Sequence, residues 1–202
     1  MEGPTKVSKK ESENKDLVYI DEHGIMGGNF YWRRRKQANF SDEQLAEVGL
    51  TDERVLVHSD IIEPLKAVDR AFGARGCRLY IAEGYRSKGL YALVNKKMKD
   101  KIGEENTGRL LNMVDMPHAT GKAVDVALWD PVTDKEIFLR DGSDGIDAYF
   151  IDFYKGKDDE KSKGFQELQE FVIKILQDNG FRLGTRREYF HFNYDPQLPR
   201  NY

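Results

Sequence analysis

The sequence predicts an α+β domain in which helices pack on one face of a mainly antiparallel sheet. Two segments, 61–73 and 165–178, carry apolar residues at the spacing of amphipathic helices. The segment 123–139 contains two strand-like runs separated by the turn-forming Asp130-Pro131 pair, which indicates a hairpin and therefore antiparallel pairing. No regular alternation of strands and helices is present, and this disfavours a parallel sheet.

The first predicted elements lie in the amino-terminal quarter of the chain. Residues 1–16 are polar and lysine-rich, so we expect a flexible tail there and a folded domain over 17–202. Ser41 and Gln44 have the spacing of a capping box, which predicts a short helix that ends at Gly49.

A second helix, a strand and a third helix are predicted next. Ser59, or the residue after it, is expected to open a helix that ends at Gly73. The apolar run at 79–82 predicts a strand, because it is short and is followed by a turn-forming pair. Ser87 can then cap a helix that continues to Met98.

The second half of the chain predicts a hairpin, a long loop and a final helix and strand. The strand at 123–128 is expected to turn into a partner at 137–139. Residues 140–163 carry turn formers and charges and are predicted to form a surface loop, whose aromatic residues could belong to a lid. The last helix is expected to end at 179–180, and the last strand to run over 189–194.

The overall charge argues against a polyanionic partner. With 32 basic and 35 acidic residues, the net charge of -3 provides no broad positive field to attract nucleic acid. The basic run at 33–36 could bind phosphates, but short runs of charge are more often solvated surface. Nucleic acid is therefore not an expected partner.

Cysteine content and the amino terminus bear on the cellular compartment. The single cysteine, Cys77, precedes an apolar run and is expected to be a core thiol, because one cysteine cannot form an internal disulfide. The first 16 residues hold no apolar stretch that could serve as a signal sequence or a membrane span. We therefore expect a cytoplasmic protein without a membrane partner, unless an export segment has been removed.

Three side chains far apart in the chain form a candidate metal site. His118 lies in a loop that leads into the strand carrying Asp125, and His191 lies among aromatic residues near the carboxyl terminus. Two imidazoles and one carboxylate suit Zn²⁺, and three protein ligands leave one coordination position for water. The sequence therefore predicts one catalytic Zn²⁺ per chain.

Glu188 is the candidate general base and acid. Zinc lowers the pKa of its water to about 7 in well-tuned sites. A nearby carboxylate can take the proton of that water and deliver it to the departing amine. In an ideal strand, residues 188 and 191 point to opposite faces because their separation is odd. We therefore expect a bend or bulge that places Glu188 at the mouth of the strand.

Each candidate also has a structural interpretation. A single buried histidine is more often a hydrogen-bonded structural residue than a metal ligand. Asp125 could accept hydrogen bonds at a strand end, and Glu188 could form an ion pair with Arg186 or Arg187. The occurrence of all four residues at these spacings favours the site.

Three ordered motifs resemble those of the D-alanyl-D-alanine dipeptidase family of zinc peptidases. The segment 117–128 resembles the His-x6-Asp signature of the family, 188–192 its Glu-Trp-Trp-His block, and 83–87 its Tyr-Arg block. The likeness covers residues 17–199. It implies a single domain with the fold shared by D-Ala-D-Ala peptidases and hedgehog-type zinc domains, and hydrolysis of D-alanyl-D-alanine as the activity.

The resemblance implies a role for each matched residue. His118, Asp125 and His191 would be the zinc ligands, and Glu188 the general base and acid. Arg86, at a strand-to-helix junction, would be the electrophile that stabilises the developing oxyanion, an effect worth roughly a hundredfold to a thousandfold. Without the motif, Arg86 would be interpreted as a salt bridge at the start of a helix.

Departures from the family pattern bear on the substrate. Tyr189 and Phe190 replace paired tryptophans, and Met116 stands where serine is frequent. Ser87 replaces a proline that is common in dipeptidases, which brings the Tyr-Arg-Ser block nearer to D,D- and L,D-carboxypeptidases of peptidoglycan. The element at 145–147 is similar to Gly-Phe-Asp of the dipeptidases, yet no histidine follows it before the last motif.

Three functions are consistent with these patterns. The first is hydrolysis of the free dipeptide, and the second is a carboxypeptidase or endopeptidase that acts on peptidoglycan stem peptides. A small, closed pocket would favour the former and an open groove the latter. The third is a zinc-binding module without turnover, against which Glu188 and Arg86 argue because a structural ion needs neither a base nor an electrophile.

Overall fold

The computed structural model describes residues 16–197 of the chain and confirms the predicted α+β class. Its strands are β1 (Leu17–Tyr19), β2 (Met26–Gly27), β3 (Leu56–His58), β4 (Arg78–Glu83), β5 (Ala123–Asp130), β6 (Lys135–Ile137), β7 (Phe181–Leu183) and β8 (His191–Tyr194). Strands β1 and β3 form a small sheet, and the others form a central sheet with the order β2-β4-β5-β8-β7 and β6 beside β5. The predicted tail lies outside the described residues, apart from Asp16.

The central sheet is mainly antiparallel, as predicted. Within residues 16–197, the only parallel pair of strands is β2 and β4. Strand β5 pairs with β4 along one edge and with β8 and β6 along the other, each time antiparallel. Strands β5 and β6 form the expected hairpin, in which Leu128 lies opposite Ile137, but β6 covers 135–137 and not the predicted 137–139. Strands β2 and β7 are new relative to the sequence analysis, because they are too short to show an alternating pattern.

The helices follow the predicted caps more closely than the predicted ends. They are α1 (Phe30–Arg33), α2 (Asp42–Glu47), α3 (Ile62–Gly73), α4 (Lys88–Leu110) and α5 (Glu160–Asp178). The capping box of Ser41 and Gln44 is present, and the Ser87 hydroxyl accepts a hydrogen bond at the start of α4. Helix α4 continues beyond the predicted end at Met98 to a break at Gly103, whose φ of 80° and ψ of 167° are not helical, and a second helical segment then runs to Leu110.

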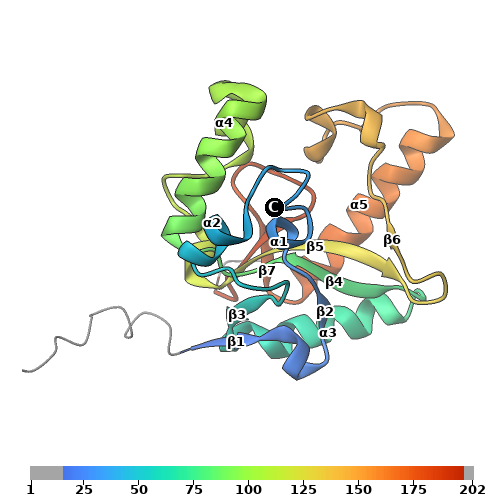
Figure 1. Cartoon of the computed structure of the whole chain (residues 1–202). Helices are drawn as coiled ribbons and strands as arrows, with labels where there is room; N and C mark the ends of the chain where they lie inside the picture. The colour runs from blue at the N-terminus through green and yellow to red at the C-terminus, as the bar shows by residue number, and fades with distance from the viewer. Residues whose placement is uncertain (1–15, 198–202) are drawn as a thin grey trace, which may run out of the picture.

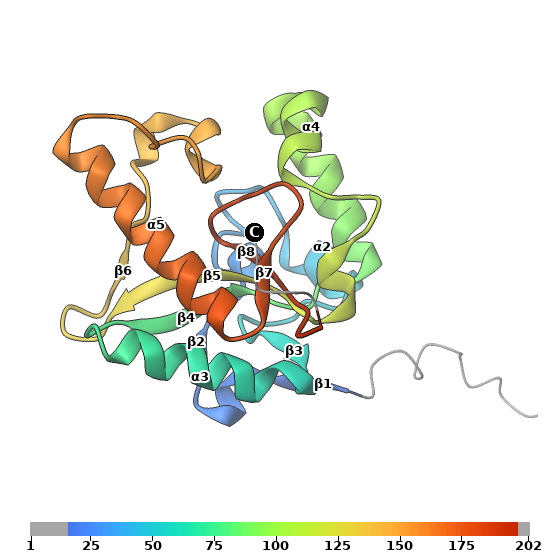
Figure 2. The same ribbon diagram turned by 180° about the vertical axis from the view of Figure 1, so that it is seen from behind.

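Helices α3 and α5 cover one face of the central sheet (Figures 1 and 2). Their apolar residues join the inward side chains of β4 and β5 in one core, which includes Leu65, Val68, Phe72, Val172, Leu176, Leu79, Ile81, Val124, Val126 and Leu128. Alternate residues of a strand face opposite sides. Because Val124 and Val126 face this core, Asp125 between them faces the other side of the sheet.

A second apolar cluster holds α4 against the segments of α1 and α2. Its buried members are Phe40, Leu45, Leu90, Tyr91, Val94 and Leu111. Figure 1 shows α4 on one side of the molecule, and the 140s segment with the start of α5 on the other. The sheet face that carries Asp125 lies between these two parts (Figure 1).

Two smaller expectations concern Cys77 and a membrane. The Cys77 side chain packs at the edge of the core and is partly exposed, so it is not the fully buried thiol that the apolar run predicted. Within the described part of the chain, no helix combines the length and the apolar composition needed to cross a membrane.

Candidate metal and catalytic site

The candidate ligands meet at one end of β5. Asp125 lies directly opposite His191, the first residue of β8, in the antiparallel register. His118 lies in the 3-10 helix η4 (Pro117–Thr120), which leads into β5. Cross-strand neighbours on one face of a sheet have adjacent side chains. The pairing of β5 with β8 therefore brings together residues that are 66 positions apart.

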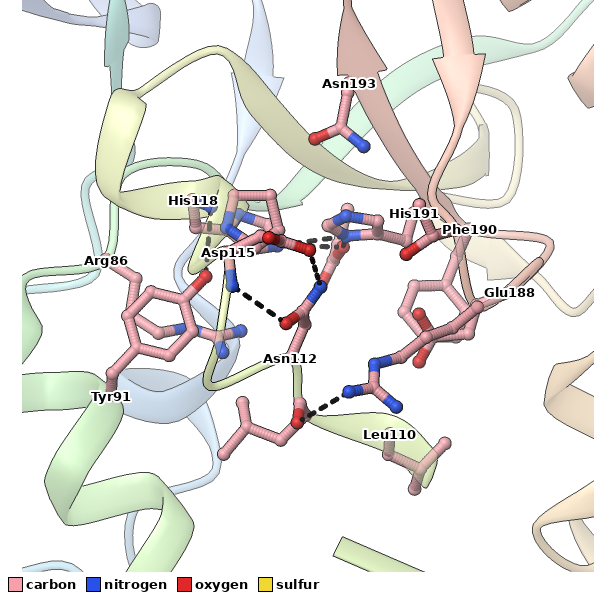
Figure 3. A pocket seen from close by; sticks show the side chains of 15 residues that line it. Arg86, Tyr91, Leu110, Asn112, Asp115, His118, Glu188, Phe190, His191 and Asn193 are labelled. Carbon is pink, nitrogen blue, oxygen red and sulfur yellow. Dashed lines mark hydrogen bonds and ion pairs between the residues drawn. The ribbon is translucent and has the colours of Figure 1, made fainter. Parts of the chain in front are cut away.

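The three ligand atoms are spaced as around one small cation. His118 Nε2 lies 3.1 Å from His191 Nδ1 and 3.3 Å from Asp125 Oδ1 (Figure 3). His191 Nδ1 lies 2.8 Å from Asp125 Oδ1. Tetrahedral zinc with bonds of about 2.0–2.2 Å separates its ligand atoms by about 3.3 Å. The three residues could hold such an ion with only small shifts.

The surroundings of His118 leave its Nε2 free to bind a cation. His118 Nδ1 lies 2.7 Å from the Gly84 carbonyl oxygen, and since a carbonyl can only accept, Nδ1 carries the proton. Nε2 then presents a lone pair toward the other two ligands. Gly84 has no space for a side chain, because a Cβ would collide with the Leu56 carbonyl of β3. The glycine thus allows the close approach that positions the carbonyl.

The charge on Asp125 also suits a cation. Burial acts to raise the pKa of Asp125, but His118 and His191 together outweigh it and hold that pKa below its usual value. The carboxylate therefore remains ionised between two imidazoles. Two neutral nitrogen ligands and one anionic oxygen ligand are a donor set that zinc accepts.

The bend predicted before His191 is present, and it brings Glu188 into the same cavity. Arg187 adopts a left-handed φ of 61°, and the His191 N–H donates to the Glu188 carbonyl at 3.2 Å. Strand β8 consequently begins at His191, two residues later than predicted. Glu188 is only 4% exposed, and burial raises the pKa of its carboxyl to about 7, against the lowering effect of His191.

Arg86 is buried and is oriented by Glu83, a residue that the sequence analysis did not single out as functional. Arg86 Nε donates to Glu83 Oε1 at 2.7 Å, and Nη2 donates to Oε2 at 2.5 Å. The rings of Tyr31 and Tyr91 lie 5.2 and 4.5 Å from the guanidinium carbon. A signal was available in the sequence, because Glu83 is an acidic residue at the end of an apolar strand, where charge needs a partner.

All five residues predicted for the site line one cavity of about 250 Å³, shown in Figure 3. The cavity wall also contains residues that the sequence did not assign to the site, among them Asn112, Asp115 and Arg186. Asn112 Nδ2 donates to Asp115 at 2.9 Å, and Asn112 Oδ1 accepts from the Asp115 N–H at 3.0 Å. This Asx turn follows α4 and borders the site opposite Glu188 (Figure 3).

Comparisons with known proteins give two similar solved structures. No protein-family model and no curated protein matches the sequence. One similar structure is the LdcB LD-carboxypeptidase, with 16% identity over 70% of this chain and 61% of that chain, and a TM-score of 0.46. The other is the vancomycin resistance D,D-dipeptidase VanXYg in complex with a D-Ala-D-Ala phosphinate analog. It has 18% identity over 88% of this chain and 66% of that chain, and a TM-score of 0.47. This chain therefore spans less than two thirds of the length of either.

Proposed function

We propose that this chain is a zinc-dependent peptidase that hydrolyses D-alanyl-D-alanine. The observation that supports a metallopeptidase is the convergence of His118, Asp125 and His191 in a cavity that also contains a buried Glu188. The resemblance of the three sequence motifs to D-alanyl-D-alanine dipeptidases supports the choice of substrate.

The chain's own residues would divide the chemistry among them. Bound zinc would supply Lewis acidity, which makes water a better nucleophile at neutral pH. His118, Asp125 and His191 would hold the ion and leave one position open. Glu188 would accept a proton from the attacking water and donate it to the departing amine. A bound cation would lower the pKa of Glu188 from about 7, which keeps the carboxylate ready to accept at neutral pH.

Arg86 would stabilise the negative charge that develops on the peptide oxygen. Its guanidinium is already oriented by Glu83 and by two tyrosine rings, so little reorganisation is needed when that charge forms. Glu83 occupies Nε and one N–H of Nη2, which leaves the N–H groups of Nη1 for a substrate oxygen. A group that stabilises only the transition state raises kcat more than it changes KM.

The dimensions of the cavity favour a short substrate. Its volume of about 250 Å³ lies below the usual range of ligand pockets, roughly 300–1,000 Å³. A second hollow, lined by Arg109, Phe150 and Arg186, adjoins the cavity through Arg186. That hollow is the observation that favours the second candidate function, a peptidoglycan carboxypeptidase whose substrate extends beyond two residues.

Replacement of Glu188 by glutamine tests the proposal, with Glu167→Gln as the control because Glu167 is exposed on α5. We expect one zinc per chain in the wild type and in both variants by elemental analysis. Turnover of D-Ala-D-Ala should fall at least about a hundredfold in Glu188→Gln only.

The other outcomes assign the remaining functions. If a stem pentapeptide is hydrolysed faster than the dipeptide, the proposed function becomes that of a peptidoglycan carboxypeptidase. Zinc binding without turnover of any peptide would indicate a binding module. Full activity of Glu188→Gln would remove Glu188 from the mechanism.

A further inference from the structure

Arg186 lies in the wall that separates the site cavity from the second hollow. It belongs to the segment between β7 and β8, two residues before Glu188, and it lines both spaces. Neither the metal site nor the proposed chemistry at Glu188 uses it. Its contacts therefore need a separate explanation.

The guanidinium of Arg186 is held by carbonyl groups at the end of α4. Nη1 donates to the Gly108 carbonyl, and at 3.3 Å to the Arg109 carbonyl. Nη2 donates to the Leu111 carbonyl at 3.3 Å. These bonds orient the side chain, since the carboxyl end of a helix attracts a cation. Within residues 16–197, no aspartate or glutamate forms an ion pair with Arg186.

The guanidinium of Arg186 lacks the carboxylate acceptor that Arg78 and Arg86 have. Arg78 binds Asp69 through Nε and Nη2, each at 2.9 Å, and Arg86 binds Glu83 through the same two atoms. In Arg186, Nε is buried and has no hydrogen-bond partner among the described residues, and Nη2 donates one bond, to the Leu111 carbonyl after α4. Nε and one N–H of Nη2 therefore have no acceptor within residues 16–197, and a guanidinium can bind both oxygens of a carboxylate through these two atoms.

A bound carboxylate would relieve this imbalance. A half-buried cation that lacks a counter-ion is less stable than one that is paired, and carbonyl dipoles supply only part of a negative charge. Glu188, the nearby acid, interacts with the charge of Arg186 through space, but it is assigned to proton transfer. An anionic group of the substrate can supply the missing charge.

We propose that Arg186 binds a carboxylate of the peptide substrate through its Nε and Nη2 atoms, and so selects peptides that carry an acidic group close to the cleaved bond. This inference rests on the proposed peptidase function. Two sources share the chemistry, namely the carboxyl terminus of a short peptide and the acidic side chain of a stem peptide. The small cavity favours the carboxyl terminus.

The test compares D-Ala-D-Ala with its carboxyl-terminal amide in the wild type and in Arg186→Gln. We expect KM for the acid to rise about tenfold to a hundredfold in the variant, as for the loss of a charged hydrogen bond, while KM for the amide stays unchanged. The matched control is Arg187→Gln, because Arg187 is exposed and pairs with Asp152 at 3.3 Å. An equal effect on acid and amide would show that Arg186 only caps α4, and would overturn the proposal.

A binding measurement separates this inference from the peptidase function. Calorimetric titration of D-Ala-D-Ala into Glu188→Gln and into Glu188→Gln with Arg186→Gln needs no turnover. The inference is supported if the Glu188→Gln protein binds the acid more tightly than the amide and the double variant does not. This result would hold even if the protein hydrolyses no peptide. Equal binding of acid and amide by the Glu188→Gln protein would overturn it.

Two further arms address the source of the carboxylate and the folding of the variant. A tetrapeptide with an internal glutamate and an amidated carboxyl terminus would lose affinity in Arg186→Gln only if the side chain is the group that is bound. If Arg186→Gln does not fold, Arg186→Lys is tested instead. Lysine keeps the positive charge but cannot donate to both oxygens of a carboxylate from two nitrogen atoms. It should raise KM for the acid by a smaller factor and again leave the amide unchanged, whereas equal changes for both would overturn the proposal.

Discussion

Replacement of Glu83 by glutamine should destabilise the protein and impair Arg86 together. The Glu83 and Arg86 side chains are 2% and 6% exposed, and two hydrogen bonds of 2.7 and 2.5 Å join them. Glutamine keeps the shape and one acceptor but removes the negative charge. The variant therefore leaves a buried guanidinium without its counter-ion, which is the costly way to disrupt such a pair.

The expected magnitude follows from that burial. Removal of one partner from a buried ion pair costs about 3–5 kcal/mol. In a chain of this length, 1 kcal/mol corresponds to about 2–4 °C, so the melting temperature should fall on the order of 10 °C. Asp21→Asn is the matched control, because Asp21 also accepts hydrogen bonds from Nε and Nη2 of an arginine, Arg54. The side chains of this pair are far more exposed, Asp21 at 55% and Arg54 at 35%. That change should lower the melting temperature far less, because solvent screens the charges of an exposed pair.

Denaturation and kinetics would be measured on the same preparations. Urea unfolding of the single variants Glu83→Gln and Arg86→Met, and of the double variant, gives a double-mutant cycle. The double variant should lose less than the sum of the single losses, since it leaves no unpaired charge. For active protein, kcat should fall more than KM rises, because Arg86 loses its orientation. A loss below about 1 kcal/mol in Glu83→Gln, or additive losses in the cycle, would refute this account of the pair.

Two further predictions concern the second histidine and the loop before α5. In Gly184→Ala, the new Cβ would collide with the His191 ring. The rise in melting temperature on addition of zinc should therefore shrink or vanish in this variant. Gly142→Ala is the control and should keep the rise, because nothing lies within 4 Å of a Cβ at Gly142. Unchanged zinc stabilisation in Gly184→Ala would contradict the placement of His191. Burial and a hydrogen bond to Asp144 raise the pKa of Tyr154 from 10.0 to about 12. The folded protein therefore holds the phenol proton more tightly than the unfolded chain does. This contribution to the free energy of unfolding should be complete below pH 10 and be lost as the pH rises to 12. Tyr154→Phe should cost about 1 kcal/mol at pH 7 and flatten this decline in urea titrations, and an equally steep decline in the variant would exclude Tyr154 as its cause.

The sequence alone determined the features that depend on neighbouring residues. The caps at Ser41 and Ser87 were predicted correctly because the capping hydroxyl bonds backbone groups within three residues. The β5-β6 hairpin followed from a local turn signal between two apolar runs. The end of α4 was not predicted, because the helix runs past Met98 to a break at Gly103 and a second segment follows to Leu110, and the apolar spacing does not mark either point.

The candidate site divides in the same way. Residue type and motif spacing named His118, Asp125, His191, Glu188 and Arg86, because coordination and proton transfer restrict which side chains can serve. Their convergence came only from the register of β5 against β8 and from the left-handed turn at Arg187. Such pairing joins segments far apart in the chain, and no local pattern encodes it.

The partners of the two arginines were likewise decided by the tertiary structure. Glu83 lies three residues from Arg86, but only the folded strand end shows that it is buried and bound through both oxygens. Arg186 was noted in the sequence as a possible partner of Glu188, whereas the fold places its guanidinium on carbonyls at the end of α4 and in the cavity wall. The physical reason is that burial and unpaired charge are properties of the packed chain, and a sequence lists the groups without the distances between them.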